Sequence, residues 1–405
     1  MASVFQLSCS PIPQVRIALI GLGDRGMKTL RRYAYIHHAV IKYVVDLSET
    51  NARKANEALR LSGRPEAGVL VGDDAWQRAC RLPDVDLIYI CTEWRLHAAM
   101  SIYAMQCGKH VAVEVPAATT VDECHALVRT AEETQRHLFM TENCCYDLFT
   151  LQTLQLVRQG RLGRLCHLEG AYIHRLTEPS TALTPRSATR QAWMQYSFME
   201  HGGNPYPTHA VGPIARLLGI HRGDRFVSIC SLTAKGERVN GLSIGRISNS
   251  LLTTESGCTV LLQLDVTTPR PYSRMQTVCG TKGYVQKYPV PIVQLSTDHE
   301  NAADHADGEP DIPAEAMVGE AAEAFMRSYC SDSSAVRLWF EGKAMGVPNE
   351  MNYTMDARLI ECLRNGSPLD IDVYDAAEWS CLAELSQRSA AQGGVPVEVP
   401  VFYHP

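Results

Sequence analysis

The stretch VRIALIGLGDRG, residues 15–26, decides the fold. Its first half is an apolar run rich in β-branched residues, which is typical of a buried strand. Its second half has the spacing G-x-G-x-x-G, and a helical pattern follows from Arg25 to about Tyr35. A strand, a glycine turn and a helix in this order predict a dinucleotide-binding βαβ unit.

The residues of the turn have separate physical roles. Gly21 permits the tight turn, Gly23 lets the main chain approach a pyrophosphate, and Gly26 lets the helix pack closely on the strand. The helix that starts beside Asp24 and Arg25 offers free N–H groups to phosphate oxygens. Asp46 ends the next predicted strand, 39–46. A carboxylate there binds ribose hydroxyls and repels a 2′-phosphate, so we expect a Rossmann domain that prefers NAD to NADP.

The strand and helix patterns go on alternating up to about residue 147. Further strands are predicted at 85–91, 111–115 and 138–141, and helices at 49–59, 96–107 and 121–134. This alternation predicts a parallel sheet, whose ligands bind at the carboxyl ends of the strands. Three segments follow predicted strands in this way, namely 92–97, 114–116 and 141–143. For Trp94, packing is as good an interpretation as a cofactor contact. Glu142 is expected to cap the following helix.

After about Leu148 the pattern changes. Strand-like segments recur without a helix between each pair, at 166–173, 226–233, 250–255, 259–265 and 275–279. They predict a second, α+β domain with a large, mostly antiparallel sheet. The fold class is therefore α/β, with an NAD-binding domain at 1–147 and a substrate and oligomerisation domain at 148–405. Helices predicted at 351–365 and 372–392 are expected to pack back on the first domain, and 296–313 is expected to be an acidic surface loop.

Composition excludes several classes of protein. The chain has 405 residues, a formal net charge of -6 and 14 cysteines, none of them spaced as C-x-x-C. A nucleic-acid partner and a membrane span are disfavoured, because there is no strongly basic patch and no long apolar run. No metal site and no disulfide framework are expected. A reducing compartment is favoured, hence the cytoplasm; export of a chain whose signal has been removed is left open.

A candidate acid–base pair lies in the string YPTH, residues 206–209. Tyr206 and His209 are three residues apart, in a turn that precedes an apolar helix predicted at 210–218. Both side chains can then point into one cleft, and imidazole and phenol groups can both move protons. Spacing alone leaves a second interpretation open, in which Tyr206 caps the turn and His209 is a buried, satisfied imidazole.

Four strings together resemble one family. They are EVPA at 114–117, ENCCY at 142–146, YPTH at 206–209 with VGP at 211–213, and DVYDAAEWS at 372–380. They resemble glycoside hydrolase family 109, the NAD-dependent α-N-acetylgalactosaminidases, within the Gfo/Idh/MocA oxidoreductase superfamily. The resemblance implies NAD contacts from Gly21, Gly23, Asp24, Arg25, Gly26, Asp46, Trp94, His97, Glu114, Val115 and Asn143. It implies sugar contacts from Tyr172, Arg190, Tyr206, Pro207, Thr208, His209 and Tyr272, with Tyr206 and His209 catalytic.

The resemblance also implies a mechanism, that of a retaining exo-glycosidase. The sugar is oxidised at C3, loses a proton from C2, expels its C1 leaving group, adds water and is reduced again. Which of the two catalytic residues takes which proton is left open. A homo-oligomer is expected from the fold class.

Two positions separate this activity from the alternatives. Dehydrogenases of the superfamily usually carry Glu-Lys-Pro, whereas this chain has Val115 in place of the lysine. They often carry an acid four residues before the histidine, where this chain has Pro205. Both differences favour the glycosidase over an NAD-dependent sugar or inositol dehydrogenase, which remains the alternative. A non-catalytic NAD-binding sensor is the third possibility.

Overall fold

The structure is a computed structural model, and it describes residues 3–176, 197–198, 201–239, 242–295, 316–329 and 333–403. The chain divides into two units. Unit 1 comprises Met1–Asp147, Ser333–Cys381 and Pro400–Pro405, and unit 2 comprises Leu148–Asp332 and Leu382–Val399. The division of the chain into domains 1–147 and 148–405, with C-terminal helices packed on the first, stays a prediction.

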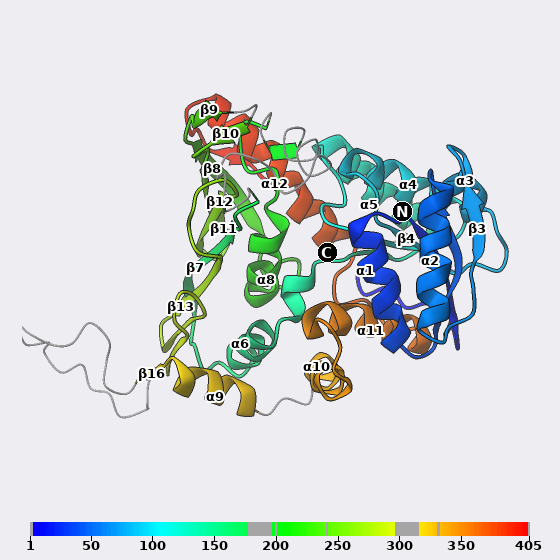
Figure 1. Cartoon of the computed structure of the whole chain (residues 1–405). Coiled ribbons are helices and arrows are strands. Elements are labelled where there is room, and N and C mark those ends of the chain that lie inside the picture. The colour runs from blue at the N-terminus through cyan, green and yellow to red at the C-terminus, as the bar shows by residue number, and fades with distance from the viewer. Residues whose placement is uncertain are drawn as a thin grey trace, which may run out of the picture. The chain divides into compact units, whose positions relative to one another are not determined.

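Unit 1 contains a six-stranded sheet with the strand order β3-β2-β1-β4-β5-β6. Its strands are β1 (Val15–Ile20), β2 (Ala39–Asp46), β3 (Gly68–Val71), β4 (Leu87–Ile90), β5 (His110–Val113) and β6 (Leu138–Met140), of which Figure 1 labels β3 and β4. Every neighbouring pair in it is parallel. The predicted parallel Rossmann sheet is therefore confirmed.

The helices of unit 1 alternate with these strands, and more follow from the C-terminal part of the chain. They are α1 (Asp24–Arg32), η1 (Tyr33–Tyr35), α2 (Glu49–Leu61), α3 (Ala75–Cys80), α4 (Trp94–Gln106), α5 (Val121–Thr134), η2 (Asn143–Tyr146), α10 (Ser334–Met345) and α11 (Glu350–Asn365). The strand β2 and the helix α5 have the bounds that the sequence predicts. The short strand β3 and helix α3 were not predicted: they have four and six residues, and β3 is exposed or half-buried along its length.

A buried polar network joins α11 to the Rossmann sheet within unit 1. The Arg32 Nε on α1 donates to the Asp356 carboxylate on α11 at 2.6 Å, and the Tyr89 hydroxyl on β4 donates to its other oxygen at 3.0 Å. Burial works against the charge on Arg32, but the Asp356 carboxylate outweighs it and raises the pKa of Arg32. Breaking such a pair would leave an uncompensated buried charge, so the network fixes α11 in place.

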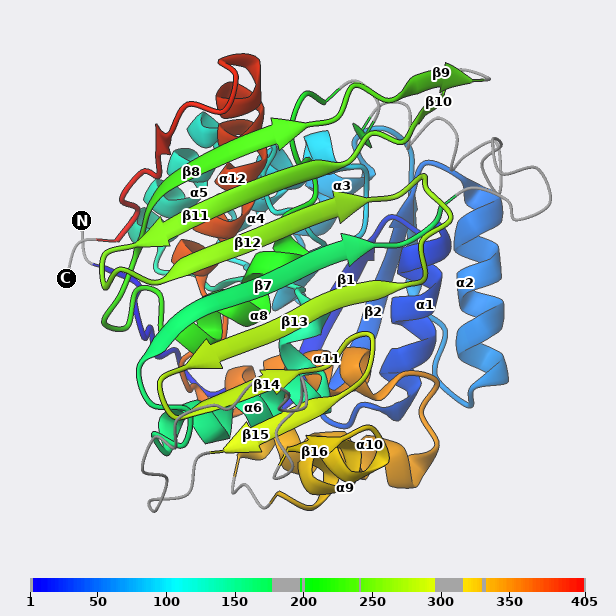
Figure 2. The same ribbon diagram turned by 90° about the vertical axis from the view of Figure 1, so that its left-hand side faces the viewer.

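Unit 2 contains a nine-stranded sheet with the order β16-β15-β14-β13-β7-β12-β11-β8-β17 (Figure 2). Only β7 and β12 pair in parallel, and all other neighbours are antiparallel. The prediction of a large, mostly antiparallel sheet is confirmed. The strands are β7 (Leu165–Ile173), β8 (Phe226–Thr233), β11 (Ser248–Thr254), β12 (Thr259–Asp265), β13 (Ser273–Gly280), β14 (Gly283–Gln286), β15 (Ile292–Leu295), β16 (Met317–Val318) and β17 (Val397–Glu398).

Smaller elements complete unit 2. They are a two-stranded sheet of β9 (Glu237–Val239) and β10 (Leu242–Ile244), with the helices α6 (Leu148–Arg158), α8 (Thr208–Leu218) and α9 (Glu320–Ser328). Figure 2 shows α6 and α8 behind the strands of the large sheet. The helix α12 (Val373–Ala391) begins in unit 1 and ends in unit 2. Several strands of two to four residues were not predicted, because so short a run carries no readable alternation. The predicted loop 296–313 lies outside the described residues.

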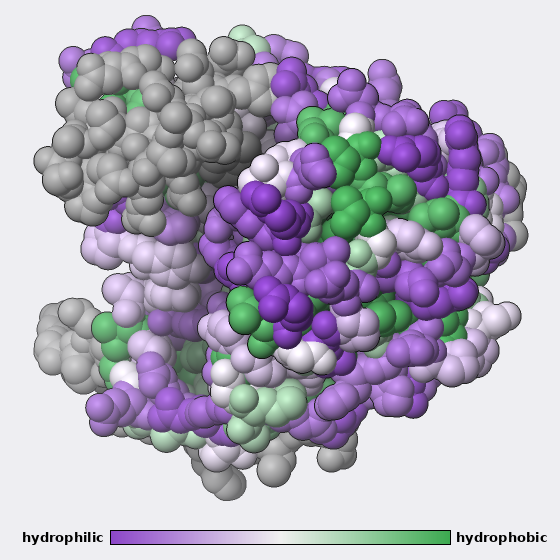
Figure 3. Space-filling model, turned by 45° about the vertical axis from the view of Figure 1, so that its right-hand side comes forward, coloured by the Kyte–Doolittle hydropathy of each residue, from purple (hydrophilic) through white to green (hydrophobic). Residues whose placement is uncertain are grey.

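The surface shows the mixture of polar and apolar residues that the composition predicts (Figure 3). The face drawn in Figure 3 is mainly hydrophilic, with hydrophobic groups between the polar ones. Among the residues that the structure describes, no helix is long and apolar enough to cross a membrane.

Candidate functional site

The glycine turn of unit 1 lies between β1 and α1. Gly21 has a φ of +88°, and a Cβ there would lie 2.6 Å from the Cys91 carbonyl oxygen. A Cβ at Gly26 would lie 1.8 Å from the Gly21 oxygen. These two positions therefore require glycine for the fold itself. Around Gly23, by contrast, a Cβ would meet nothing within 4 Å. Gly23 also caps α1 without a side-chain hydrogen bond, so the helix N-terminus has the open approach that a pyrophosphate needs.

The end of β2 is joined to this turn by Asp46. Its Oδ2 accepts the Leu22 N–H at 2.7 Å, and its Oδ1 accepts the Ser48 N–H at 2.8 Å and the Asn51 Nδ2 at 3.2 Å. The carboxylate thus orders the turn. An ionised carboxylate offers about four acceptor positions, so at least one remains for a ribose hydroxyl.

Arg25 and Glu114 form an ion pair that links the glycine turn to the end of β5. The Arg25 Nε lies 2.8 Å from the Glu114 Oε2. The other oxygen, Oε1, is buried and has no hydrogen-bond partner among the described residues. A buried acceptor without a donor costs free energy unless a ligand or water supplies one. The space beside Gly23 can admit a pyrophosphate, and the Glu114 Oε1 can accept a hydrogen bond from a ligand. The carboxyl edge of the sheet therefore fits a dinucleotide.

Other predicted cofactor residues are buried parts of the same unit. His97 is fully buried, with Nδ1 2.7 Å from the Pro116 carbonyl oxygen and Nε2 3.1 Å from that of Thr92. Burial lowers the pKa of His97, and since a neutral imidazole has one N–H, it can donate to only one of these two carbonyl oxygens at a time. Trp94 is 9% exposed and Val115 is 2% exposed. A direct NAD contact by these three side chains stays a prediction.

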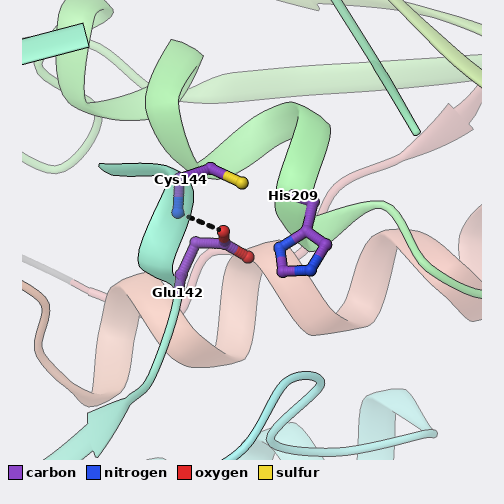
Figure 4. Close-up of side chains that lie close together, drawn as sticks. All are labelled: Glu142, Cys144 and His209. Atoms are coloured by element: carbon purple, nitrogen blue, oxygen red, sulfur yellow. Dashed lines mark hydrogen bonds between the residues drawn. The ribbon is translucent and has the colours of Figure 1, made fainter. Parts of the chain in front are cut away.

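The loop after β6 is fixed by its own side chains. The Glu142 carboxylate accepts the Cys144 backbone N–H at 3.0 Å and caps η2, which confirms the predicted cap (Figure 4). The Asn143 Nδ2 donates to the Asn352 Oδ1 on α11 at 2.7 Å. The amide of Asn143 is therefore oriented by α11, a contact that the sequence did not predict.

In unit 2 the YPTH turn leads into α8, which packs closely on β7. A Cβ at Gly170 would lie 2.6 Å from the Ala210 carbonyl oxygen, so glycine at this strand position lets the helix approach. The Tyr206 hydroxyl and the His209 Nε2 are 3.0 Å apart, and both residues are buried. The predicted pair therefore forms a direct phenol–imidazole hydrogen bond. Which of the two atoms donates depends on the tautomer of the imidazole.

Hydrogen bonds with other parts of unit 2 fix the YPTH turn in position. The Asn204 Oδ1 accepts the Tyr206 N–H at 3.0 Å, and the Asn204 N–H donates to the Ser386 Oγ at 2.8 Å. A Cβ at Gly203 would lie 2.4 Å from the same Ser386 Oγ. Pro207 caps α8, and Thr208 is its first, fully buried residue. These contacts fix the position of Tyr206, and Thr208 contributes to the packing of the turn.

Tyr172, near the end of β7, packs against this pair. Its ring centroid is 4.9 Å from that of Tyr206 and 5.5 Å from that of His209. Its hydroxyl is 3.0 Å from the Nδ1 of His174. A second phenol–imidazole pair therefore lies beside the first, and the sequence did not predict His174 as part of the site.

Tyr272 belongs to the same cluster through sheet pairing, because Ser273 on β13 pairs with Ile173 on β7. Its ring centroid is 5.6 Å from that of His174, and the residue is 47% exposed. The Arg274 guanidinium lies 4.7 Å from the Tyr172 ring centroid and 5.4 Å from that of Tyr272. The Arg274 Nε also donates to the Tyr272 hydroxyl at 2.7 Å. Arg274 was not predicted either.

We call this group of side chains the aromatic cluster; it consists of Tyr172, His174, Tyr206, His209, Tyr272 and Arg274. Aromatic faces and polar tips of this kind suit a sugar, which presents both C–H and hydroxyl groups. Arg190, a predicted sugar contact, lies outside the described residues. The sequence does carry a weak signal for these two residues. His174 is two residues after Tyr172, directly after β7, and Arg274 is two residues after Tyr272, near the start of β13.

The parallel sheet and the glycine turn define the class of protein, an oxidoreductase-type NAD-binding Rossmann fold. Residues 15–142 match the family described as "Oxidoreductase family, NAD-binding Rossmann fold". A similar solved structure is levoglucosan dehydrogenase in complex with NADH and levoglucosan. It has a TM-score of 0.70 and 18% identity, and the match covers 96% of this chain and 100% of that one. Another is aldose-aldose oxidoreductase from Caulobacter crescentus, with a TM-score of 0.68 and 20% identity over 95% of this chain and 99% of that one. At these identities the likeness shows the fold.

The family follows from the full-length relatives. Residues 146–404 match "Glycosyl hydrolase 109, C-terminal domain". "Glycosyl hydrolase family 109 protein 2" of Phocaeicola vulgatus is 46% identical, over 99% of this chain and 97% of its own length. "Alpha-N-acetylgalactosaminidase" of Bacteroides fragilis is also 46% identical, over 98% and 94%. The chain belongs to glycosyl hydrolase family 109.

Proposed function

We propose that this enzyme is an NAD-dependent retaining exo-glycosidase that removes terminal α-N-acetylgalactosamine or a related sugar. The observation that carries the proposal is the buried hydrogen bond of 3.0 Å between Tyr206 and His209, within a cluster of sugar-compatible aromatic rings. The relative named for this activity, at 46% identity over 98% of the chain, supports the choice of sugar.

The residues that would hold NAD are those of the glycine turn and the strand ends. The N-terminus of α1 at Gly23 would bind the pyrophosphate, and Asp46 would bind the adenosine ribose. Arg25 and Glu114, at the end of β5, would contact the part of NAD that lies beyond the pyrophosphate. When bound, NAD supplies a hydride acceptor that oxidises the sugar at C3 and later reduces it again. Because the cycle returns every hydride, we propose that the cofactor stays tightly bound between turnovers.

The chain's own groups then have to move protons and orient the sugar. The C3 hydroxyl loses its proton when C3 is oxidised, and the adjacent C2–H becomes acidic beside the new ketone. The Tyr206 hydroxyl and the His209 imidazole can take up and return a proton through their shared hydrogen bond. Tyr172 and Tyr272 provide ring faces against which the sugar can pack. Burial of Tyr206 and His209 keeps water away from the proton that they share.

We also propose that the protein works as a homo-oligomer in a reducing compartment. Outward positions on the large sheet carry apolar side chains, for example Leu232 at 61% and Leu251 at 45% exposed. The cysteines that the structure describes are all free thiols, which fits a reducing environment. Sedimentation velocity would test the first part, since a monomer at micromolar concentration would contradict it.

The activity is tested with a nitrophenyl α-N-acetylgalactosaminide, following nitrophenol and the absorbance of NADH together. The proposal expects continuous nitrophenol release without accumulation of NADH. NADH formed in proportion to free sugar would instead identify a dehydrogenase. Bound NAD with neither product would identify a non-catalytic NAD-binding protein.

A further inference from the structure

We propose that Tyr172 and His174 form a second proton-transferring pair of the sugar site, beside the pair of Tyr206 and His209. The inference rests on the proposed function and deepens it. The reaction has two proton-transfer tasks, at the C3 hydroxyl and at C2, and the aromatic cluster contains two phenol–imidazole pairs. In this scheme Tyr172 is the catalytic residue that meets the sugar, and His174 is the positioning residue that receives its proton.

The two pairs have the same oxygen-to-nitrogen distance, although they use different imidazole nitrogens. In one, the Tyr206 hydroxyl is 3.0 Å from the His209 Nε2; in the other, the Tyr172 hydroxyl is 3.0 Å from the His174 Nδ1. Each histidine follows its tyrosine by two or three residues, but the backbones differ: one pair precedes and begins α8, and the other ends β7. Two separate elements of unit 2 thus each carry a phenol–imidazole hydrogen bond.

The pairs are also next to one another. The Tyr172 ring makes an edge-on contact with the Tyr206 ring at 4.9 Å and lies 5.5 Å from the His209 ring. Tyr172 and Tyr206 are each 8% exposed; the hydrogen bond of Tyr206 with His209 is buried, and that of Tyr172 with His174 is partly buried. A sugar that packs against the rings of Tyr172 and Tyr206 can therefore contact both phenol oxygens.

Proton transfer by the pair conserves atoms and charge. The Tyr172 oxygen takes a proton from the sugar while its own proton passes to the His174 Nδ1. The substrate loses one proton and the pair gains one, together with one positive charge; the return half of the cycle reverses both transfers. No oxidant or reductant takes part in this step beyond the bound NAD of the proposed function.

The test replaces the titrating imidazole by an amide of similar reach. The change His174→Asn keeps a hydrogen-bonding group near the Tyr172 hydroxyl but removes the ability to take a proton. The matched control is His167→Asn on the same strand, whose Nδ1 bonds the Thr259 hydroxyl at 2.8 Å. Substrates are the nitrophenyl α-N-acetylgalactosaminide for turnover and free N-acetylgalactosamine for binding.

For His174→Asn we expect kcat to fall by about 100-fold or more, with KM within about 3-fold of the wild type, because general acid–base groups contribute on this scale. For His167→Asn we expect wild-type kcat and KM. If kcat of His174→Asn stays within about 3-fold of wild type while His174→Ala is impaired, His174 only holds Tyr172 in place and the proposal is overturned.

A binding readout separates this proposal from the proposed function. If the wild type hydrolyses no glycoside, the proposed function fails whatever His174 does. Titration with N-acetylgalactosamine is then followed by the histidine ring proton resonance that is missing from the His174→Asn spectrum. A shift of that resonance on sugar binding retains the pair as part of a sugar site, and no shift overturns it.

Discussion

The glycine turn of unit 1 and the aromatic cluster of unit 2 are built in opposite ways. The turn consists of consecutive residues, 21–26, and acts through main-chain N–H groups and the space left by missing side chains. The cluster consists of side chains from three segments, 172–174, 206–209 and 272–274, and acts through their hydroxyl, imidazole and guanidinium groups. A site made of main chain therefore tolerates changes of neighbouring side chains, whereas a site made of side chains depends on each of them.

The largest effect is expected in the cluster. Tyr206→Phe removes the hydroxyl that bonds the His209 Nε2, and kcat should fall by about 10²- to 10⁴-fold, the range of general acid–base catalysis. Nitrophenol release at saturating substrate measures it. The control is Tyr284→Phe, which removes a hydroxyl bonded to Gln286 on β14 of the same unit and should leave kcat unchanged. Equal loss in both variants would point to a stability effect and break the comparison.

The second effect concerns acid, and it should separate the two units. Burial lowers the pKa of His110 to about 4 and that of His137 to about 3, and it lowers that of His97 as well, all in unit 1. In unit 2, burial lowers the pKa of His201 to about 4. These histidines are neutral when folded but take up protons near pH 6.5 when unfolded. Stability is therefore present above pH 6.5 and falls as the pH drops towards 4.

The expected loss at pH 5 is about 2 kcal/mol for each of His110 and His137, from the linkage between protonation and unfolding. Hydrogen exchange followed by mass spectrometry at pH 7 and pH 5, corrected for the intrinsic exchange rate, measures it peptide by peptide. Peptides of β5 and β6 in unit 1 should lose more protection than those of β7 and β12 in unit 2. In His137→Gln the difference should shrink, and a uniform loss in the wild type would refute the assignment.

The third effect separates stability of the fold from affinity for NAD at two glycines of the turn. Gly21→Ala should destabilise the protein by about 1–3 kcal/mol, because a Cβ would meet the Cys91 carbonyl at 2.6 Å with φ at +88°. Gly23→Ala meets nothing within 4 Å and should leave stability within about 0.5 kcal/mol. Its methyl group would nevertheless stand where a pyrophosphate approaches, so the affinity for NAD should fall by about 10-fold or more. Urea unfolding and calorimetric titration with NAD measure the two quantities.

The same contrast explains how far the sequence could be interpreted. The parallel sheet and the second, antiparallel sheet followed from apolar periodicity, and the glycine turn followed from consecutive residues whose roles are steric. The pair of Tyr206 and His209 was found because one turn holds both. His174 stands two residues from Tyr172 and bonds its hydroxyl, but that spacing alone is a weak signal. Arg274 was not found because its contact with Tyr172 depends on the pairing of β13 with β7, and sequence periodicity does not give strand register. The register includes bulges near Met275, which no pattern announced.

The smallest effect tests Asp46 as the selector of NAD over NADP. Asp46→Asn removes a negative charge from the end of β2, so the repulsion of a 2′-phosphate should weaken and the ratio of NADP to NAD affinity should rise by about 10-fold. The substitution also disturbs the turn, because the amide nitrogen cannot accept the Leu22 or Ser48 N–H as the carboxylate does. That disturbance weakens both cofactors alike and cancels in the ratio. Glu49→Gln removes an exposed charge three residues away and controls for the general field. An unchanged ratio in Asp46→Asn would mean that Asp46 serves the turn alone, and the main-chain site would then owe its selectivity to another group.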